Sequence, residues 1–367
     1  MDGDTNDVSD VFVSDATRAV SRVSVTTGGD QARGLTELPA ISASGRIVAF
    51  MSSTYDLAAP GDRNRRRTIF FHNRVTGRTK RASDRSDGRR AIGDAYDPSI
   101  SSSGRYIAFV SDAPDLAMKG DRNGGEDVFV HDRKTGKTNR VSLSRRMGDP
   151  DHESGAPAIS GNGRYVAFNS FATNLVRNDD NGELDVYVYD RVKRRNDLVS
   201  ITTGGKQGGD YSFSPAISGD GRYVAFASYA ALADTDAAGQ DVYLRDRGSG
   251  ITEHVSVGYR GAGNGDSFYP SISADGRYVA FVSMADNLVP DDGNGVLDVF
   301  VRDRKGGTTT RVSVGDDGEE PTEPSWGPPE LSPDGSYVCW TNASTNLDDV
   351  EDDGEAEDVF LRGPLWD

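Results

Sequence analysis

The sequence predicts an all-β protein, a six-bladed β-propeller made of four-stranded antiparallel blades, and three observations carry this prediction. One segment, typified by SPAISGDGRYVAF from Ser214, recurs six times with few changes. Its proline lies at positions 39, 98, 157, 215, 270 and 329, a spacing of 55 to 59 residues that is typical of one stacked supersecondary unit. The chain of 367 residues contains 43 glycines and only 35% hydrophobic residues, which fits many short strands joined by polar turns.

Each repeat contains signals for four strands. Pro-x-Ile-Ser is a short first strand, a two-residue turn such as Asp-Gly follows, and Tyr-Val-Ala-Phe alternates as the second strand. The third strand is read as DVFV at Asp10, DVFV at Asp127, DVYV at Asp185, DVYL at Asp241, DVFV at Asp298, DVFL at Asp358 and a weaker TIFF at Thr68. The fourth is read as SRVSV from Ser21, NRVSL from Asn139, EHVSV from Glu253 and TRVSV from Thr310. Four antiparallel strands make one propeller blade.

The two ends of the chain are expected to meet in one blade. We predict a single domain over residues 1–367, with blades that begin near residues 38, 97, 156, 214, 269 and 328. The last repeat stops without a fourth strand, whereas residues 1–25 contain a third and a fourth strand, so Ser21 to Val25 should complete the last blade. The third strand is then present twice, which predicts either a fifth outer strand on a monomer or a strand-exchanged dimer.

Composition narrows the range of partners. The chain has 58 acidic and 41 basic residues and a net charge of −17, so we expect no nucleic acid partner. No apolar run approaches the roughly 20 residues of a membrane-spanning helix, so no membrane insertion is expected. The N-terminus MDGDTNDVSD has no signal region, which fits a cytoplasmic protein or an exported one given without its signal. The single cysteine, Cys339, replaces the Ala of other repeats and is interpreted as core packing.

These repeats resemble the WD-like, TolB-type β-propeller family, which includes the propeller of the periplasmic Tol–Pal protein. The resemblance rests on Pro-x-Ile-Ser-x-Asp-Gly-Arg-Tyr-Val-Ala-Phe followed by Asp-Val-Phe-Val-x-Asp-Arg, and it covers nearly the whole chain. It implies a propeller that acts as a protein-binding module or as part of a larger exported protein. A secreted or periplasmic location follows from the same resemblance.

A polar pattern precedes four of the third strands and suggests calcium. Asp, Asn and Asp stand at relative positions one, three and seven in the sets Asp4, Asn6, Asp10; Asp121, Asn123, Asp127; Asp179, Asn181, Asp185; and Asp292, Asn294, Asp298. The spacing resembles half of the calcium loops in integrin, thrombospondin and dockerin repeats, and hard oxygen ligands favour Ca²⁺. The alternative is plain turn chemistry, in which Asx side chains bond their own backbone. Both interpretations stay open.

The connectors that enter the first strands are a second candidate site. In a propeller these connectors surround the mouth of the central channel. They contain acidic and aromatic residues, which suit a protein, a peptide or a small polar ligand such as a sugar or an amine. The candidate residues are Tyr96, Asp97, His152, Glu153, Asp210, Tyr211, Phe213, Asp266, Phe268, Tyr269 and Trp326. Packing of the connectors against each other is the alternative.

Motifs of common enzymes are missing from the sequence. It contains no Gly-x-Ser-x-Gly elbow, no His-Glu-x-x-His, no phosphate-binding glycine loop and no cysteine pair. The sequence therefore favours a non-enzymatic binding or scaffold propeller with calcium as a structural ion. The alternative is a metal-dependent hydrolase of the lactonase type, with a divalent ion held by Asp97, Glu153, Asp210 and Asp266. A basic stretch with Arg85, Arg89 and Arg90 is interpreted as a solvated loop.

Overall fold

The structure is a computed structural model that describes residues 5–15, 17–54, 57–58, 66–116, 121–234, 239–347 and 358–366. The regular elements in these ranges are all β-strands. The described residues contain no helix that is long and apolar enough to cross a membrane.

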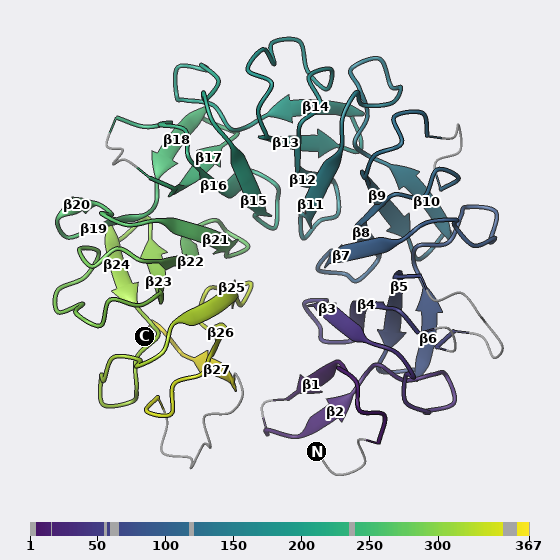
Figure 1. The fold of residues 1–367 in the computed structure, drawn as a ribbon, viewed down its shortest axis with the longest axis horizontal. Coiled ribbons are helices and arrows are strands. Elements are labelled where there is room, and N and C mark those ends of the chain that lie inside the picture. Colours follow the sequence, from purple (N-terminus) through teal and green to yellow (C-terminus); the bar gives the residue numbers. More distant parts are fainter. Residues whose placement is uncertain are drawn as a thin grey trace. The chain divides into compact units, whose positions relative to one another are not determined.

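Six successive antiparallel sheets, five with four strands and the last with three among the described residues, confirm the prediction of a six-bladed β-propeller with four-stranded antiparallel blades (Figure 1). The first strands are β3 (Thr36–Ile41), β7 (Ala95–Ile100), β11 (Ser154–Ile159), β15 (Ser212–Ile217), β21 (Ser267–Ile272) and β25 (Ser325–Leu331). The second strands are β4 (Ile47–Ser52), β8 (Tyr106–Ser111), β12 (Tyr165–Ser170), β16 (Tyr223–Ser228), β22 (Tyr278–Ser283) and β26 (Val338–Asn342). The third strands are β5 (Thr68–Asn73), β9 (Asp127–Asp132), β13 (Asp185–Asp190), β17 (Asp241–Asp246), β23 (Asp298–Asp303) and β27 (Asp358–Arg362). The fourth strands are β6 (Arg78–Arg81), β10 (Lys137–Arg140), β14 (Arg195–Leu198), β18 (Ile251–His254) and β24 (Thr308–Arg311).

The strands near the chain ends form smaller sheets. Strand β1 (Phe12–Ser14) pairs with β2 (Val20–Arg22), and β25, β26 and β27 form a three-stranded sheet. A short ribbon, β19 (Val257–Gly258) with β20 (Gly261–Ala262), follows the fourth blade. Completion of the last blade by Ser21 to Val25 stays a prediction.

The described residues belong to two compact units, Met1–Asn178 with Tyr189–Asn196, and Asp179–Val188 with Asp197–Asp367. In each unit the core is built from the second and third strands. Phe109 and Phe129 stack at 5.9 Å in the first unit, and Phe281 stacks on Phe300 at 5.8 Å in the second. Since strand residues alternate between faces, Tyr-Val-Ala-Phe buries both of its faces when neighbouring blades cover them.

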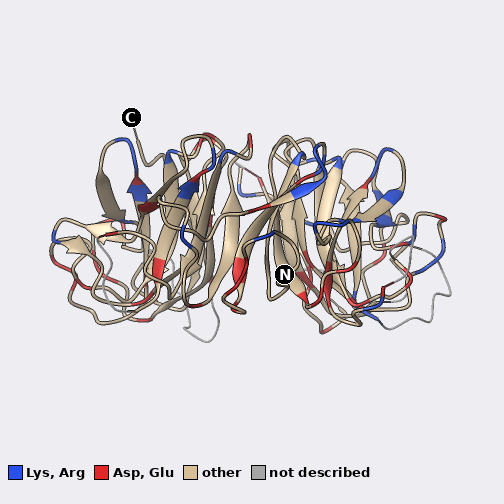
Figure 2. Ribbon diagram, turned by 90° about the horizontal axis from the view of Figure 1, so that it is seen from above, with Lys and Arg blue, Asp and Glu red and all other residues tan. Residues whose placement is uncertain are grey.

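A forked ion pair fastens the end of several blades. Arg105 Nε and Nη2 donate to Asp132 at 2.9 and 2.7 Å, and Arg277 makes the same pair of bonds to Asp303. Two parallel hydrogen bonds to one carboxylate are the strong form of this interaction. The Arg277 fork lowers the pKa of Asp303 to about 2. Within each unit, Figure 2 shows Lys and Arg mainly at one end of the strands and Asp and Glu mainly at the other.

The structure corrects the position of the fourth strand. Strand β10 ends at Arg140, so the Val-Ser segment that we read as its centre follows the strand. The Ser142 hydroxyl accepts a hydrogen bond from Val128 N at 3.1 Å and donates to Asp127 Oδ1 at 2.6 Å. Val141 N still donates to Val128 O at 2.8 Å, but the Ser142 hydroxyl takes the place of a backbone carbonyl as the acceptor for Val128 N, and the regular ladder ends there.

The first strands contain a repeated irregularity before their proline. The register of β7 with β8 shifts between Tyr96 and Ser99, and the register of β21 with β22 shifts between Phe268 and Ser271. The residue before the proline has a left-handed backbone in both strands, with φ of 51° at Asp97 and 54° at Tyr269. Such bulges re-aim side chains and are frequent next to binding sites.

Candidate functional site

Three of the four Asn residues of the predicted calcium loops, Asn6, Asn181 and Asn294, make Asx turns. Asn181 Oδ1 accepts a hydrogen bond from Glu183 N at 3.1 Å, while its Nδ2 donates to Asp185 Oδ2 at 3.0 Å. Asn294 repeats both bonds, from Val296 N at 3.2 Å and to Asp298 at 3.1 Å. Asn6 Nδ2 likewise donates to Asp10 at 2.9 Å, whereas Asn123 Nδ2 donates to His152 O at 3.5 Å. Asp4 lies outside the described residues.

The Asp at the start of β9, β13 and β23 is bonded at both carboxylate oxygens. One oxygen accepts from the hydroxyl of a serine 15 residues later: Ser142 to Asp127 at 2.6 Å, Ser200 to Asp185 at 2.5 Å and Ser313 to Asp298 at 2.5 Å. The other oxygen faces the loop, where an amide or a guanidinium donates to it. A buried carboxylate with all of these donors is satisfied without a metal ion.

A buried arginine neutralises the loop that contains Asp121 and Asp127. Arg140 Nη1 lies 3.3 Å from Asp121 Oδ1 and 2.6 Å from Asp127 Oδ2, and Nη2 donates to Asp149. Only 6% of the Arg140 side chain is exposed, and 1% of that of Asp127. Burial raises the pKa of Asp127 to about 6, although Arg140 acts in the opposite direction. The guanidinium therefore supplies the positive charge that these carboxylates need.

Arg311 has the same role in the loop that contains Asp292 and Asp298. Its Nη1 lies 3.0 Å from Asp292 Oδ1, 3.5 Å from Asp298 Oδ2 and 2.7 Å from Glu320 Oε1. Burial and the neighbouring Asp298 raise the pKa of Asp292 to about 6. At the N-terminal loop, Arg22 Nε lies 3.3 Å from Asp10 Oδ2.

The third blade uses neutral donors in place of arginine. Leu198 occupies the strand position of Arg140, and Gln207 Nε2 donates to Asp179 Oδ1 at 2.9 Å and to Asp185 Oδ2 at 2.6 Å. The Tyr187 hydroxyl donates to the second oxygen of Asp179. Within the described ranges, no group of three or more His, Cys, Asp or Glu side chains is arranged to hold a metal ion. Calcium in these loops stays a prediction.

The candidate ligand-binding residues of the first unit lie at the starts of β7 and β11. Tyr96 is half-buried, and burial together with a hydrogen bond to Glu126 raises its pKa. Burial and Glu126 also raise the pKa of Asp97. His152 and Glu153 are exposed in the connector before β11, and His152 Nδ1 lies 3.7 Å from an Asp151 carboxylate oxygen.

In the second unit, large aromatic side chains are exposed where the first strands begin. Tyr211, Tyr269 and Trp326 are 43%, 40% and 52% exposed. Tyr211 directly precedes β15, Tyr269 is the third residue of β21, and Trp326 is the second residue of β25. Strand β21 contacts both β15 and β25. Phe268 and Tyr269 meet edge to face at 5.0 Å. The acidic candidates bond their own surroundings, since Asp210 accepts from Tyr211 N and Asp266 accepts from Gln240 N.

Two members of this surface were not predicted. Tyr229 and Met284 are 46% and 49% exposed and follow the second strands β16 and β22. Tyr229 N donates to Tyr211 O at 2.9 Å, and Met284 N donates to Asp266 O at 2.9 Å, so both stand beside predicted residues. The sequence feature that could have identified them is the residue directly after each second strand, which varies among the repeats. In the six repeats it is Ser53, Asp112, Phe171, Tyr229, Met284 and Ala343. We call the following set the aromatic surface: Tyr211, Phe213, Tyr229, Phe268, Tyr269, Met284 and Trp326.

The carboxylates of the hydrolase alternative are divided between the two units. Asp97 and Glu153 belong to the first unit, whereas Asp210 and Asp266 belong to the second. A divalent ion shared by these four side chains stays a prediction.

Comparisons with known proteins identify the fold. No protein-family model matches the chain, and no curated protein matches it. An oligogalacturonate lyase in complex with manganese has 14% identity and a TM-score of 0.56, over 97% of this chain and 83% of that one. An acylaminoacyl peptidase from Pyrococcus horikoshii has 14% identity and a TM-score of 0.51, over 90% of this chain and 44% of that one. A putative TolB from Agrobacterium tumefaciens has 15% identity and a TM-score of 0.49, over 82% and 86%. The chain thus has the β-propeller fold that the repeats predicted, and it shares this fold with the lyase and the peptidase.

Proposed function

We propose that this chain is a binding or scaffold propeller and that the aromatic surface of its second unit is the contact site. The observation that carries the proposal is the exposure of Tyr211, Tyr269 and Trp326 close to the starts of the first strands of three neighbouring blades. Leaving three large aromatic side chains in water is unfavourable, and such exposed groups mark sites of interaction. Other residues of the same repeat stay constant, so the blade itself does not require these aromatics.

The chemistry of the surface defines the kind of ligand. Aromatic rings stack on the apolar face of a sugar or a peptide side chain, while their hydroxyl and indole groups hydrogen bond at the rim. Asp266 and Glu323 are exposed beside the rings and suit hydroxyl or amino groups. We therefore propose a peptide or a small polar ligand with an apolar face. Calcium stabilisation and a location outside the cytoplasm remain predictions from sequence resemblance.

The test compares ligand binding by one tryptophan variant, at the site, with ligand binding by one tyrosine variant, away from it. Labelled protein is applied to a glycan array and to a peptide array, with Trp326→Ala as the site variant and Tyr259→Ala as the control. Tyr259 is equally exposed, at 52%, but lies in the ribbon between β19 and β20. We expect spots bound by the unmodified chain and by Tyr259→Ala to be lost with Trp326→Ala. Binding to nothing on either array, or equal binding by both variants, would contradict the proposal.

Fluorescence gives an independent reading of the same site. Of the three tryptophans, Trp326 is 52% exposed and Trp340 is 4% exposed, while Trp366 stacks on Tyr278 at 4.4 Å. A ligand that covers the aromatic surface should shift the emission to shorter wavelength, and the shift should be absent in Trp326→Phe.

A further inference from the structure

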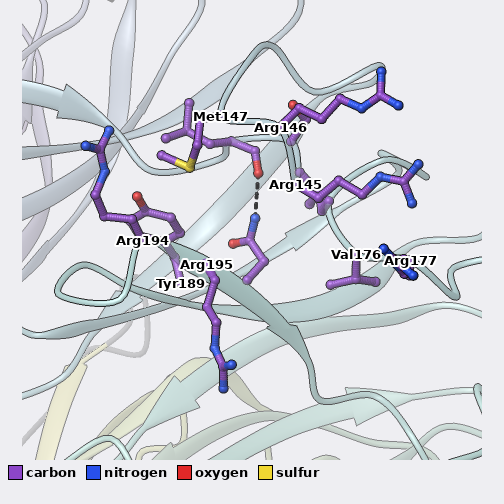
Figure 3. Close-up of a pocket in the computed structure, with 12 residues that line it drawn as sticks. Arg145, Arg146, Met147, Val176, Arg177, Tyr189, Arg194 and Arg195 are labelled. Carbon is purple, nitrogen blue, oxygen red and sulfur yellow. Dashed lines mark hydrogen bonds between the residues drawn. The ribbon is translucent and has the colours of Figure 1, made fainter.

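The first unit contains a cavity of about 780 Å³ that none of the predicted sites includes. It lies against β14 and the loops after β10 and β12, and five arginines line it: Arg145, Arg146, Arg177, Arg194 and Arg195 (Figure 3). None of the described residues that line it is acidic. On a chain with a net charge of −17, five arginines around one cavity are a strong local reversal of charge.

The cavity occurs where the chain departs from its own repeat. At three other junctions a hydroxyl in the turn after β2, β6 or β14 bonds both backbone groups of a threonine in the next fourth strand. These pairs are Thr27 with Thr79, Ser86 with Thr138, and Thr203 with Thr252. Here Arg145 takes the place of the hydroxyl residue, and Asn196 takes the place of the threonine. Asn196 Nδ2 still donates to Leu143 O at 2.6 Å, so one hydrogen bond across the junction is kept, while the Arg145 side chain lines the cavity.

A second departure lies in the same turn. Met147 has a φ of 62°, a left-handed conformation that residues with a side chain rarely adopt. The corresponding residues of the other turns are glycines with positive φ, namely Gly29, Gly88, Gly205 and Gly318. In this turn the backbone shape is kept, although glycine is replaced by a residue whose side chain lines the cavity. Unfavourable backbone of this kind concentrates at functional sites.

The side chains suit a ligand with separate negative groups on a compact frame. In Figure 3, Arg145, Arg146 and Arg177 lie on one side of the cavity and Arg194 on the other, with Met147 and Tyr189 between them. A guanidinium pairs with carboxylate or phosphate through two parallel hydrogen bonds, so separated arginines select separated oxyanions. Leu143, Leu175 and Val176 add apolar surface to the lining.

We propose that this cavity binds a small organic polyanion, with two or more carboxylate or phosphate groups carried on a compact frame. A long nucleic acid is disfavoured by the acidic surface outside the cavity. The site is separate from the aromatic surface, so the two proposals can fail independently.

Titration calorimetry of the full chain at low and moderate salt tests the proposal with three probes. Inorganic phosphate carries one anionic group, tripolyphosphate carries several phosphates, and a galacturonic acid trisaccharide carries three carboxylates. We expect at least one of the two multivalent probes to bind at least 100-fold more tightly than inorganic phosphate. The preferred probe then distinguishes a phosphate ligand from a carboxylate ligand.

Three variants assign the binding to the cavity. Arg146→Ala/Arg177→Ala is expected to weaken the preferred probe at least 10-fold, and Arg146→Lys/Arg177→Lys should weaken it less because charge is kept. The control is Arg78→Ala, because Arg78 begins β6 as Arg195 begins β14 and is also exposed. Melting curves confirm that each variant is folded; if the double alanine variant is not, Arg194→Ala replaces it. Failure of both multivalent probes to bind, or an equal loss in Arg78→Ala, would overturn the proposal.

Discussion

Replacing Arg140 by leucine tests whether a guanidinium, rather than a calcium ion, neutralises the loops before the third strands. Arg140 contacts Asp121, Asp127 and Asp149 and is 6% exposed. Removal of one partner from a buried ion pair leaves the remaining charge uncompensated, at a cost of about 3–5 kcal/mol. The entropy of unfolding is roughly 2.1 cal/mol/K per residue, so for 367 residues this cost lowers Tm by about 4–6 °C.

The loss should depend on pH in a defined direction. Burial already raises the pKa of Asp127 to about 6, and removing Arg140 raises it further. A carboxyl whose pKa is higher in the folded state contributes stability at low pH that is lost as pH rises through the folded pKa. The deficit of Arg140→Leu relative to the unmodified chain should therefore be larger at pH 7 than at pH 5. Leu198→Met is the control, because Leu198 holds the corresponding position in the third blade.

Melting curves recorded in EDTA and in millimolar Ca²⁺ complete the experiment. If a calcium ion can take over the role of the guanidinium, calcium should restore part of the Tm of the variant while shifting the unmodified chain less. A loss below 1 °C at pH 7, or a larger calcium shift in the unmodified chain than in the variant, would refute the reasoning.

Three further outcomes follow from single side chains. Arg277 lowers the pKa of Asp303 to about 2, so the ion pair stabilises the folded chain fully above pH 4, and this stabilisation is lost as the pH falls through 2. Asp303→Asn should therefore lower Tm at pH 7 and reduce the fall of Tm between pH 4 and pH 2, as melting curves would show. Phe281 is fully buried, and Phe281→Ala should cost about 3–5 kcal/mol in urea unfolding, whereas a cost below 1 kcal/mol would show that the blade core repacks. Burial raises the pKa of Cys339, so a thiol reagent at pH 7 should react slowly until urea unfolds the chain; equal rates would contradict this.

The blades could be predicted from sequence because their determinants are local and repeated. Hydrophobic alternation in Tyr-Val-Ala-Phe and the Asp-Gly turn specify a hairpin within a dozen residues. The fourth strand was misplaced because Val128 N donates to the Ser142 hydroxyl instead of to a backbone carbonyl. Alternation of hydrophobic residues does not reveal such a substitution.

The candidate sites were less predictable because their partners are distant in the chain. The Asp-x-Asn loops showed which carboxylates gather, but Arg140 and Arg311 reach them from a neighbouring strand 13 residues away. Gln207 lies 28 residues from Asp179. The local spacing therefore predicted which carboxylates gather in each loop. It did not determine whether a calcium ion, a guanidinium or a side-chain amide faces them.

Comparison among the repeats supplies the information that local spacing lacks. Corresponding residues carry the same structural requirement, so a residue that departs at some energetic cost points to a requirement outside the fold. Met147 is such a case, since a left-handed conformation costs a residue with a side chain roughly 1–2 kcal/mol, and corresponding turns use glycine. Arg145 departs from its repeat in the same turn as Met147, and both residues line the cavity together with Arg146, Arg177, Arg194 and Arg195.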